Sequence, residues 1–268
     1  MKSAPQVHLS DVQTVYSGPE GRLWELLMGQ QIHIGGFASS MDLARQAGIA
    51  AGGSGADLCC CTGAGMRFLV RFLNVARMTG VDATRTVLDL GRQRCGEEGL
   101  SDRISFVEAN VCATGLPAAN FDFVWGEDAW CYVEDKARLI AEAARLIKPN
   151  GLIAFTDWME GPVELTADEA ARYLTFMKFP NVLSLKEYTA SLEANGCRVR
   201  IAQDTGRFPK YVPLYLDMLE KQLTYDALKI IGFDMVLAQA LIGEMRFLQC
   251  LAENRKIIQG LIVAQKSA

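Results

Sequence analysis

Two stretches of the chain decide its fold, Asp57-Leu58-Cys59-Cys60-Cys61-Thr62-Gly63-Ala64-Gly65 and Met78-Thr79-Gly80-Val81-Asp82-Ala83-Thr84. In the first, an acidic residue leads into a turn of small residues, where backbone N–H groups and the next helix can approach a ligand closely. In the second, Asp82 ends an apolar strand, and an acid at this place can accept hydrogen bonds from both hydroxyls of a ribose. Together the two stretches predict a nucleoside-binding sheet with a site for adenosine.

The sequence around these stretches alternates between strand and helix signals from about residue 53 to residue 206. This pattern predicts an α/β fold with a doubly wound, mainly parallel sheet. The expected strands end at Asp57, Asp82 and Glu108 and continue with residues 121–125, 152–156 and 199–202. An amphipathic helix precedes the fifth strand, with an apolar face formed by Leu139, Ile140, Ala143, Leu146 and Ile147, and Pro149-Asn150-Gly151 is expected to stop it.

The first stretch resembles the opening motif of the class I S-adenosylmethionine-dependent methyltransferases, which usually runs acid-x-Gly-x-Gly-x-Gly. Here Cys59 and Cys61 stand at the first two glycine positions, and Gly63 keeps its place. Because glycine is wanted where a backbone bends sharply or touches a ligand, we expect Cys61 to narrow the cofactor cleft or to adopt a negative φ. Either arrangement could reduce cofactor affinity. The closing segment 259–266 resembles the family's last strand, which runs antiparallel, and this implies a seven-stranded Rossmann-like sheet.

The resemblance implies S-adenosylmethionine as the cofactor and S-adenosylhomocysteine as its product. Asp82 would hold the ribose, although a helix N-cap is the alternative role for this residue. Asn110 could accept the adenine amino group through its side-chain oxygen, and Gly126 matches the place that receives the methionine end. The full expected cofactor set is Ile32, His33, Gly35, Asp57, Cys59, Cys61, Gly63, Asp82, Ala83, Asn110, Val111, Gly126 and Glu127.

A second resemblance, to the sarcosine/dimethylglycine and phosphoethanolamine N-methyltransferases, lies upstream and at residues 127–132. Tyr16 and the turn at 28–37 are similar to the N-terminal latch of these enzymes, and Tyr16 and Gly29 keep the family's separation. The resemblance implies that Tyr16 covers the ligand and that the turn packs on the sulfonium end of the cofactor. After the Asp128-Ala129 pair the family has a histidine that pairs with the latch tyrosine, and here Tyr132 replaces it.

This replacement bears on catalysis. Tyrosine has a pKa of about 10, so Tyr132 is expected to orient the acceptor and not to remove its proton. His33 is then the best alternative base, with a packed turn residue as its other interpretation. Asp128 is a further candidate to receive the proton, directly or through water. The expected catalytic set is therefore Tyr16, His33, Asp128 and Tyr132.

The substrate side departs from the phosphobase enzymes. Their Arg-Lys-Tyr cluster aligns with Lys178, Phe179 and Pro180, so a bidentate phosphate clamp is lost. Lys178 alone could meet a carboxylate. Trp130, Tyr132, Trp158 and Tyr211 are expected to face the acceptor, where an aromatic cage could hold an ammonium group. Core or wall positions are the alternative for each of these aromatic residues.

Composition limits the remaining choices. The chain has 268 residues, half of them hydrophobic, and a formal net charge of −4, which argues against nucleic-acid or anionic-membrane partners. We expect a cytoplasmic protein, because the N-terminus lacks an apolar signal segment and no apolar stretch reaches the length of a membrane span. The 8 cysteines, irregularly spaced, fit reduced thiols, and no metal site is expected.

Four regions are expected: a helical latch over the active site at 1–50, a cofactor-binding Rossmann-like core at 51–206, a helical lid at 207–256 and the final core strand at 257–268. We interpret the chain as a methyltransferase of a small acceptor, with an amine nitrogen, as in glycine, sarcosine or dimethylglycine, as the first choice. Transfer to oxygen or carbon of a hydrophobic metabolite is one alternative. A catalytically inactive binding protein is another, and the chain is expected to be a monomer or homodimer.

Overall fold

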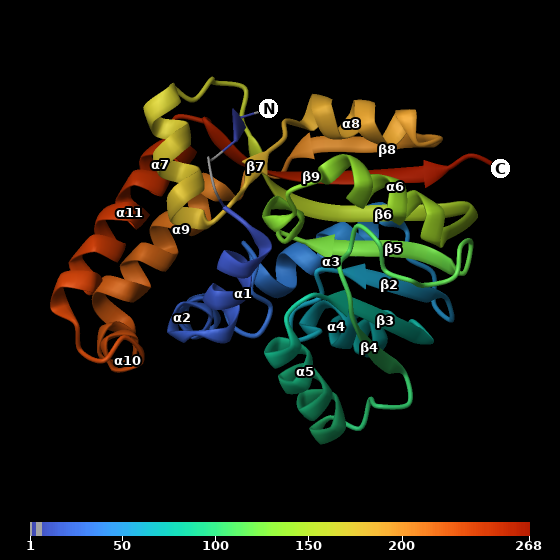
Figure 1. The fold of residues 1–268 in the computed structure, drawn as a ribbon, viewed down its shortest axis with the longest axis horizontal. Coiled ribbons are helices and arrows are strands. Elements are labelled where there is room, and N and C mark those ends of the chain that lie inside the picture. Colours follow the sequence, from blue (N-terminus) through green and yellow to red (C-terminus); the bar gives the residue numbers. More distant parts are fainter. Residues whose placement is uncertain (1, 4–6) are drawn as a thin grey trace.

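A single seven-stranded sheet forms the centre of the molecule in the computed structural model, which describes residues 2–3 and 7–268 (Figure 1). The strand order is β4-β3-β2-β5-β6-β9-β8, and β9 runs antiparallel to both of its neighbours. The predicted doubly wound sheet with an antiparallel last strand is thus confirmed. Its strands are β2 (Ser54–Leu58), β3 (Arg77–Asp82), β4 (Ile104–Glu108), β5 (Phe121–Glu127), β6 (Ile147–Glu160), β8 (Cys197–Asp204) and β9 (Ile257–Lys266).

Helices cover both faces of this sheet, because its strands carry apolar side chains in both directions. On β5, Val124 packs on one face, whereas Phe123 and Trp125 pack on the other, as the twofold alternation of a strand requires. One face is covered by α3 (Gly36–Ala47), α4 (Ala64–Phe72) and α5 (Arg85–Glu97), and the other by α6 (Lys136–Leu146) and α8 (Leu185–Ala194). The carboxyl ends of the parallel strands are left free to form a site.

A helical layer stands at one end of the sheet, on the left of Figure 1, and has its own apolar core. Trp24, Tyr173, Phe208 and Leu248 are among the buried side chains of this core. A two-stranded sheet, β1 (Lys2–Ser3) with β7 (Asn181–Val182), borders the layer. The layer contains α1 (Leu9–Ser17), α2 (Pro19–Met28), α7 (Ala167–Met177), α9 (Phe208–Asp217), the π-helical turn η2 (Met218–Gln222), α10 (Thr224–Ile230) and α11 (Met235–Glu253).

The boundary between α6 and β6 differs from the expectation. Asp135 caps α6 by accepting the N–H of Arg138, but the helix ends at Leu146 and Ile147 already begins β6. Residues 149–151, expected to stop the helix, lie inside the strand, where Asn150 adopts a φ of 64°. The helix therefore ends because the chain enters the sheet, and not at the proline.

The expectation about apolar length is wrong for α11. This helix of 19 residues, with a mean hydropathy of 1.3 in its most apolar window, is long and apolar enough to cross a membrane by length and composition alone. It packs against α9, with Met245, Leu248 and Leu251 buried, while Met235 and Val236 at its start are exposed.

Candidate active site

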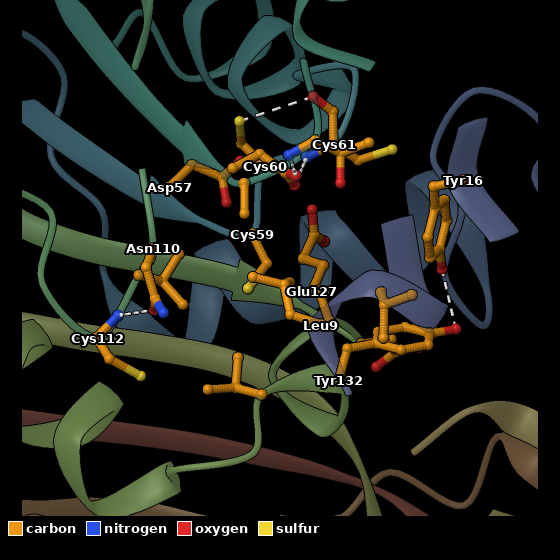
Figure 2. A pocket seen from close by; sticks show the side chains of 18 of the residues that line it. Leu9, Tyr16, Asp57, Cys59, Cys60, Cys61, Asn110, Cys112, Glu127 and Tyr132 are labelled. Atoms are coloured by element: carbon orange, nitrogen blue, oxygen red, sulfur yellow. Dashed lines mark hydrogen bonds between the residues drawn. The ribbon is translucent and has the colours of Figure 1, made fainter. Parts of the chain in front are cut away.

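A cavity of about 820 Å³ opens at the carboxyl ends of β2, β3, β4 and β5, beneath α1 (Figure 2). This volume lies within the range of about 300–1,000 Å³ typical of small-molecule sites. The position is also where ligands bind in open α/β sheets. The predicted site residues that line it are Tyr16, Ile32, His33, Asp57, Cys59, Cys61, Asp82, Ala83, Asn110, Val111, Glu127, Asp128 and Tyr132.

Asp82 ends β3 and faces the turn that follows β2. Its carboxylate accepts the N–H of Cys61 at 3.0 Å and the N–H of Thr84 at 2.9 Å. Burial raises the pKa of Asp82, and the hydrogen bonds from Thr84 and Cys61 oppose that effect. A carboxylate has about four acceptor positions, so roughly two remain for a ligand. The N-cap of α5 is Thr84 and not Asp82, so the alternative role, capping the next helix, does not fall to Asp82.

The turn itself uses left-handed backbone at alternate residues. Cys59 has a φ of 65°, Cys61 a φ of 47° and Gly63 a φ of 71°. The expectation that Cys61 adopts a negative φ is therefore wrong. Glycine adopts this left-handed backbone readily. Cys59 and Cys61 have a Cβ and adopt it at a cost of about 1–2 kcal/mol each. Burial raises the pKa of both thiols, so they are protonated and poorly nucleophilic at neutral pH.

An acidic corner lies between β2, β5 and the start of α4. The side chain of Glu127 extends toward the turn at 57–65 (Figure 2), and a Cβ added at Gly65 would lie 2.8 Å from its Oε2 and 3.5 Å from Asp57 Oδ2. Burial and the neighbouring carboxylates of Glu127 and Asp82 raise the pKa of Asp57. Glu127 Oε1 is buried and has no hydrogen-bond partner among the described residues. Two carboxylates beside a residue without a side chain form a place for a cationic group.

Asn110 and Val111 form the wall beyond the end of β4. Asn110 Oδ1 accepts the N–H of Cys112 at 2.9 Å, which folds the chain into an Asx turn. One acceptor position of that oxygen is thus used within the protein and one remains. Val111 is buried beside it. Contact of these residues with an adenine ring stays a prediction.

Two tyrosines from distant segments meet across the cavity. The Tyr16 hydroxyl donates to the Tyr132 hydroxyl at 2.9 Å, and the rings meet edge to face with centroids 5.4 Å apart (Figure 2). Burial raises the pKa of each well above its ordinary value. Neither phenol is a base near neutral pH. Because Tyr132 accepts the hydrogen of Tyr16, its own O–H remains available to a ligand.

Tyr132 is the last residue of the turn η1 (Trp130–Tyr132), and buried hydrogen bonds hold this turn in place. The carboxylate of Asp157, on β6, accepts the N–H of Cys131 at 2.9 Å and the hydroxyl of Tyr188 at 2.6 Å. The ammonium group of Lys136 donates to the carbonyl oxygen of Cys131 at 3.2 Å. Burial raises the pKa of Asp157 to about 6. These contacts fix the turn, and hence the direction of the Tyr132 ring.

His33 and Asp128 are both buried at the cavity wall. His33 Nε2 lies 3.1 Å from Ser40 Oγ and 3.4 Å from Glu127 Oε1, while Nδ1 has no partner in the described chain. The carboxylate of Asp128 accepts the N–H of Ile34 at 2.8 Å and the side-chain amide of Gln259 at 2.8 and 3.0 Å. Burial raises the pKa of Asp128. Because its oxygens already accept hydrogen bonds from Ile34 and Gln259, a positioning role is favoured for Asp128 over the role of a base.

The expectation that Trp130 and Trp158 face the acceptor is wrong. Trp130 is fully buried; its indole N–H donates to Leu58 O at 3.2 Å and its ring stacks on Phe155. Gly126 leaves room for that indole, since a Cβ there would lie 2.4 Å from Trp130 Nε1. Trp158 packs against Phe208 in the core of the helical layer, with ring centroids 4.3 Å apart.

The other expected positions outside the cavity lining are Gly35, Gly63, Gly126, Lys178 and Tyr211. Gly63 caps the start of α4, and Gly35 donates its N–H to Tyr215. Lys178 ends α7 in left-handed backbone. Tyr211 packs against Tyr215, with ring centroids 6.1 Å apart.

Sequence reasoning missed part of the wall. Leu9 and Val12 of α1, Val133 after η1 and Leu183 add an apolar side to the cavity. Single apolar residues in helices and loops carry no local signal of this placement. Within residues 2–3 and 7–268, no group of three or more His, Cys, Asp or Glu side chains is arranged to hold a metal ion.

Comparison with known proteins agrees with this geometry. Residues 56–155 match the model of a methyltransferase domain family. A 27-O-demethylrifamycin SV methyltransferase of Amycolatopsis mediterranei is 27% identical over 51% of this chain and 51% of its own length. A dimethylglycine N-methyltransferase of Parasynechococcus marenigrum is 28% identical over 65% of this chain and 66% of its own. The chain spans about half the length of several curated relatives that it matches.

Solved structures share the whole fold. A putative sarcosine dimethylglycine methyltransferase of Galdieria sulphuraria superposes with a TM-score of 0.80 at 19% identity, covering 93% of this chain and 97% of that one. A phosphoethanolamine N-methyltransferase 2 of Haemonchus contortus, solved with phosphomonomethylethanolamine and S-adenosylhomocysteine, gives 0.85 at 17% identity, covering 99% and 61%. Residues 56–155 thus match a methyltransferase domain, and the chain as a whole shares the fold of these two methyltransferase structures.

Proposed function

We propose that this protein binds S-adenosylmethionine in the cavity and transfers its methyl group to a small-molecule acceptor. The observation that carries this proposal is the cavity's ordered set of acids. Asp82 has free acceptor positions at the end of β3, and Asp57 and Glu127 form a separate acidic corner at the end of β2 and β5. A ribose diol and an ammonium group are the two ends of the cofactor that such acids bind.

The residues present fit the cofactor. Asp82 would hold the ribose, Asn110 and Val111 the adenine, and Asp57 with Glu127 the amino group of the methionine end. The buried Glu127 Oε1 supports the last assignment: it accepts no hydrogen bond from the described residues, His33 Nε2 lies 3.4 Å from it, and a buried acceptor left without a donor costs about 1–3 kcal/mol. The bound cofactor supplies a methyl group already activated on a sulfonium. The protein's task is then mainly orientation and exclusion of water.

We propose an amine nitrogen as the acceptor. The Tyr132 oxygen can accept an N–H of a primary or secondary amine while the nitrogen lone pair stays free, and the raised pKa of Tyr132 keeps the phenol neutral. Burial among Leu9, Val12 and Tyr16 would lower the pKa of a bound amine, so that it enters the reaction uncharged. A base is not required for this step. The dimethylglycine and phosphoethanolamine enzymes among the similar proteins support this choice.

A hydrophobic acceptor methylated on oxygen or carbon is the second candidate. The apolar side of the cavity, with Leu9, Val12, Val133 and Leu183, favours it. A phenol or enol would need a base, and His33 with its unpartnered Nδ1 is then the residue available.

Transfer of labelled methyl groups from S-adenosylmethionine tests the proposal. The acceptor panel contains glycine, sarcosine, dimethylglycine, ethanolamine, phosphoethanolamine, small diamines and several phenols. A labelled amine would support the first choice, and a labelled phenol with no labelled amine would replace it by the second. Cofactor binding without any labelled product would exclude every acceptor tested, and a chain that does not bind the cofactor would contradict the proposed activity itself.

A further inference from the structure

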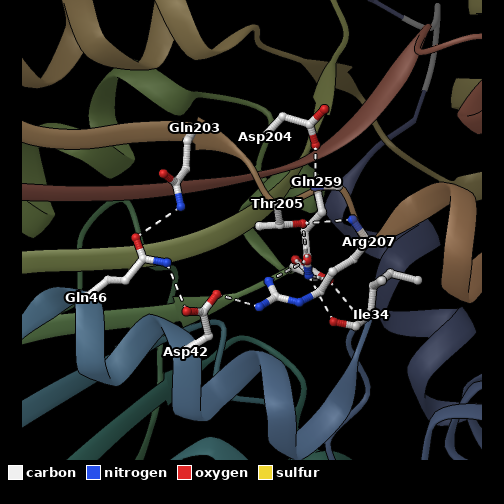
Figure 3. Close-up of polar contacts among 10 residues, drawn as sticks. Ile34, Asp42, Gln46, Gln203, Asp204, Thr205, Arg207 and Gln259 are labelled. Carbon is white, nitrogen blue, oxygen red and sulfur yellow. Dashed lines mark hydrogen bonds and ion pairs between the residues drawn. The ribbon is translucent and has the colours of Figure 1, made fainter.

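Gln259 is a polar residue in the buried part of strand β9, residues 257–264, where its neighbours are apolar or glycine. Its side chain is fully buried, and its amide makes every hydrogen bond that an amide can make. The NH₂ group donates to Ile34 O at 3.1 Å and to the Asp128 carboxylate at 2.8 and 3.0 Å. The carbonyl oxygen accepts from Thr205 Oγ1 at 2.9 Å and from Arg207 Nη1 at 3.3 Å (Figure 3).

One side of this network belongs to the helical layer. Arg207 directly precedes α9, and its guanidinium also pairs with Asp42 of α3 at 2.5 Å (Figure 3). The aliphatic part of Arg207 runs close to Gly35, where an added Cβ would lie 3.0 Å from Arg207 Cδ. Tyr215 of α9 accepts the N–H of Gly35 at 3.2 Å. Residues at both ends of α9 therefore contact the turn at residues 30–36.

The other side of the network reaches the cavity. The turn at 30–36 contributes Ile32 and His33 to the cavity wall, and Asp128 lines it as well. Ile34 bonds to Asp128 through its N–H and to Gln259 through its carbonyl. Gln259 and Arg207 are not among the residues that line the cavity. Any influence they have on a ligand must act through the turn and through Asp128.

We propose that Gln259 and Arg207 are positioning residues that couple α9 of the helical layer to the cofactor cavity. The Gln259 amide fixes the turn at 30–36 against Asp128, and Arg207 fixes that amide. The coupling to cofactor affinity rests on the proposed function; the placement of the turn does not. Without the amide, the Ile34 carbonyl loses its side-chain partner and the Asp128 carboxylate keeps the Ile34 N–H. A buried polar group without its hydrogen-bond partner is destabilised, so the turn would shift to expose the Ile34 carbonyl to water. Ile32 and His33 would move with it.

Two measurements on the full chain test this proposal. Calorimetric titration gives the S-adenosylhomocysteine affinity, and hydrogen exchange of the amides at 32–36 is followed without ligand. Gln259→Met keeps the length of the side chain and removes its hydrogen bonds. Gln265→Met on the same strand is the matched control, since that exposed amide bonds to Asn150 O and to Arg200 and makes no hydrogen bond to the described turn at 30–36. Arg207→Gln removes the ion pair with Asp42 of α3, and so perturbs the network at the residue that precedes α9.

Gln259→Met is expected to weaken S-adenosylhomocysteine binding at least tenfold and to speed exchange at 32–36 at least tenfold, with Arg207→Gln changing both in the same direction. Gln265→Met should change neither. A lower melting temperature with both readouts within twofold of the parent chain would show that the amide is merely structural and would overturn the proposal. Should Gln259→Met not fold, Arg207→Gln decides by the same thresholds. A parent chain that does not bind the ligand contradicts the proposed function, while the exchange data still decide whether the network positions the turn.

Discussion

Replacing Asp82 by alanine tests the assignment of the ribose site. Two acceptor positions of its carboxylate are taken by the N–H groups of Cys61 and Thr84, and about two remain. A hydrogen bond to a charged group contributes about 1.5–3 kcal/mol, so the loss of two bonds to a diol would cost about 3–6 kcal/mol. This corresponds to a weakening of S-adenosylhomocysteine binding by about 10²- to 10⁴-fold.

Calorimetric titration of the folded variant measures this loss. Asp89→Ala is the matched control, because Asp89 is an exposed acid of the neighbouring helix α5 that pairs with Arg92. Asp82→Asn keeps the size of the side chain but turns one acceptor into a donor, so it should fall between the parent chain and Asp82→Ala. An Asp82→Ala dissociation constant within threefold of the parent's would refute the assignment.

Three further predictions concern backbone strain, the phenol pair and pH. Cys59→Gly removes left-handed strain at a φ of 65° and should raise the free energy of unfolding by about 0.5–1 kcal/mol, whereas Cys60→Gly, at a buried position without positive φ, should lower it; equal losses in urea titrations of the two variants would contradict this. Tyr16→Phe deletes one neutral hydrogen bond to Tyr132, so turnover should fall about 2- to 10-fold with S-adenosylhomocysteine affinity unchanged, and an unaltered rate would remove Tyr16 from the mechanism. Asp157 has a pKa raised to about 6 in the folded state, so its ionisation destabilises the fold. The stabilisation associated with the protonated carboxyl is present at pH 4, is lost as pH rises through 6, and amounts to about 3 kcal/mol. Asp157→Asn should flatten the stability profile between about pH 4 and 6.5, and an unchanged slope would show that other groups control it.

The fold and one half of the site were predictable because they depend on local patterns. Strand-end acids such as Asp57 and Asp82 follow from the alternation of strands and helices, and parallel strands bring their carboxyl ends to one edge. The meeting of Tyr16 and Tyr132 was accessible only through resemblance to a family, since 116 residues separate them in sequence.

The remainder depends on side-chain direction and tertiary contacts. Trp130 was expected at the cavity because it follows a strand. Its indole instead lies buried in the core, in the space that the missing side chain of Gly126 leaves. The positive φ of Cys61 could not be foreseen, because residues with a Cβ rarely adopt it and the hydrogen bond to Asp82 that accompanies it here is a tertiary contact. Gln259 is the polar residue within the buried part of β9, residues 257–264, and no local pattern identifies its distant hydrogen-bond partners.

A crystal structure of the full chain with S-adenosylhomocysteine tests the central claim most directly. We expect the ribose hydroxyls within hydrogen-bond distance of Asp82, the adenine beside Asn110 and Val111, and the amino group between Asp57 and Glu127. A ligand bound elsewhere, or an adenosine that leaves the Asp82 carboxylate uncontacted, would contradict it.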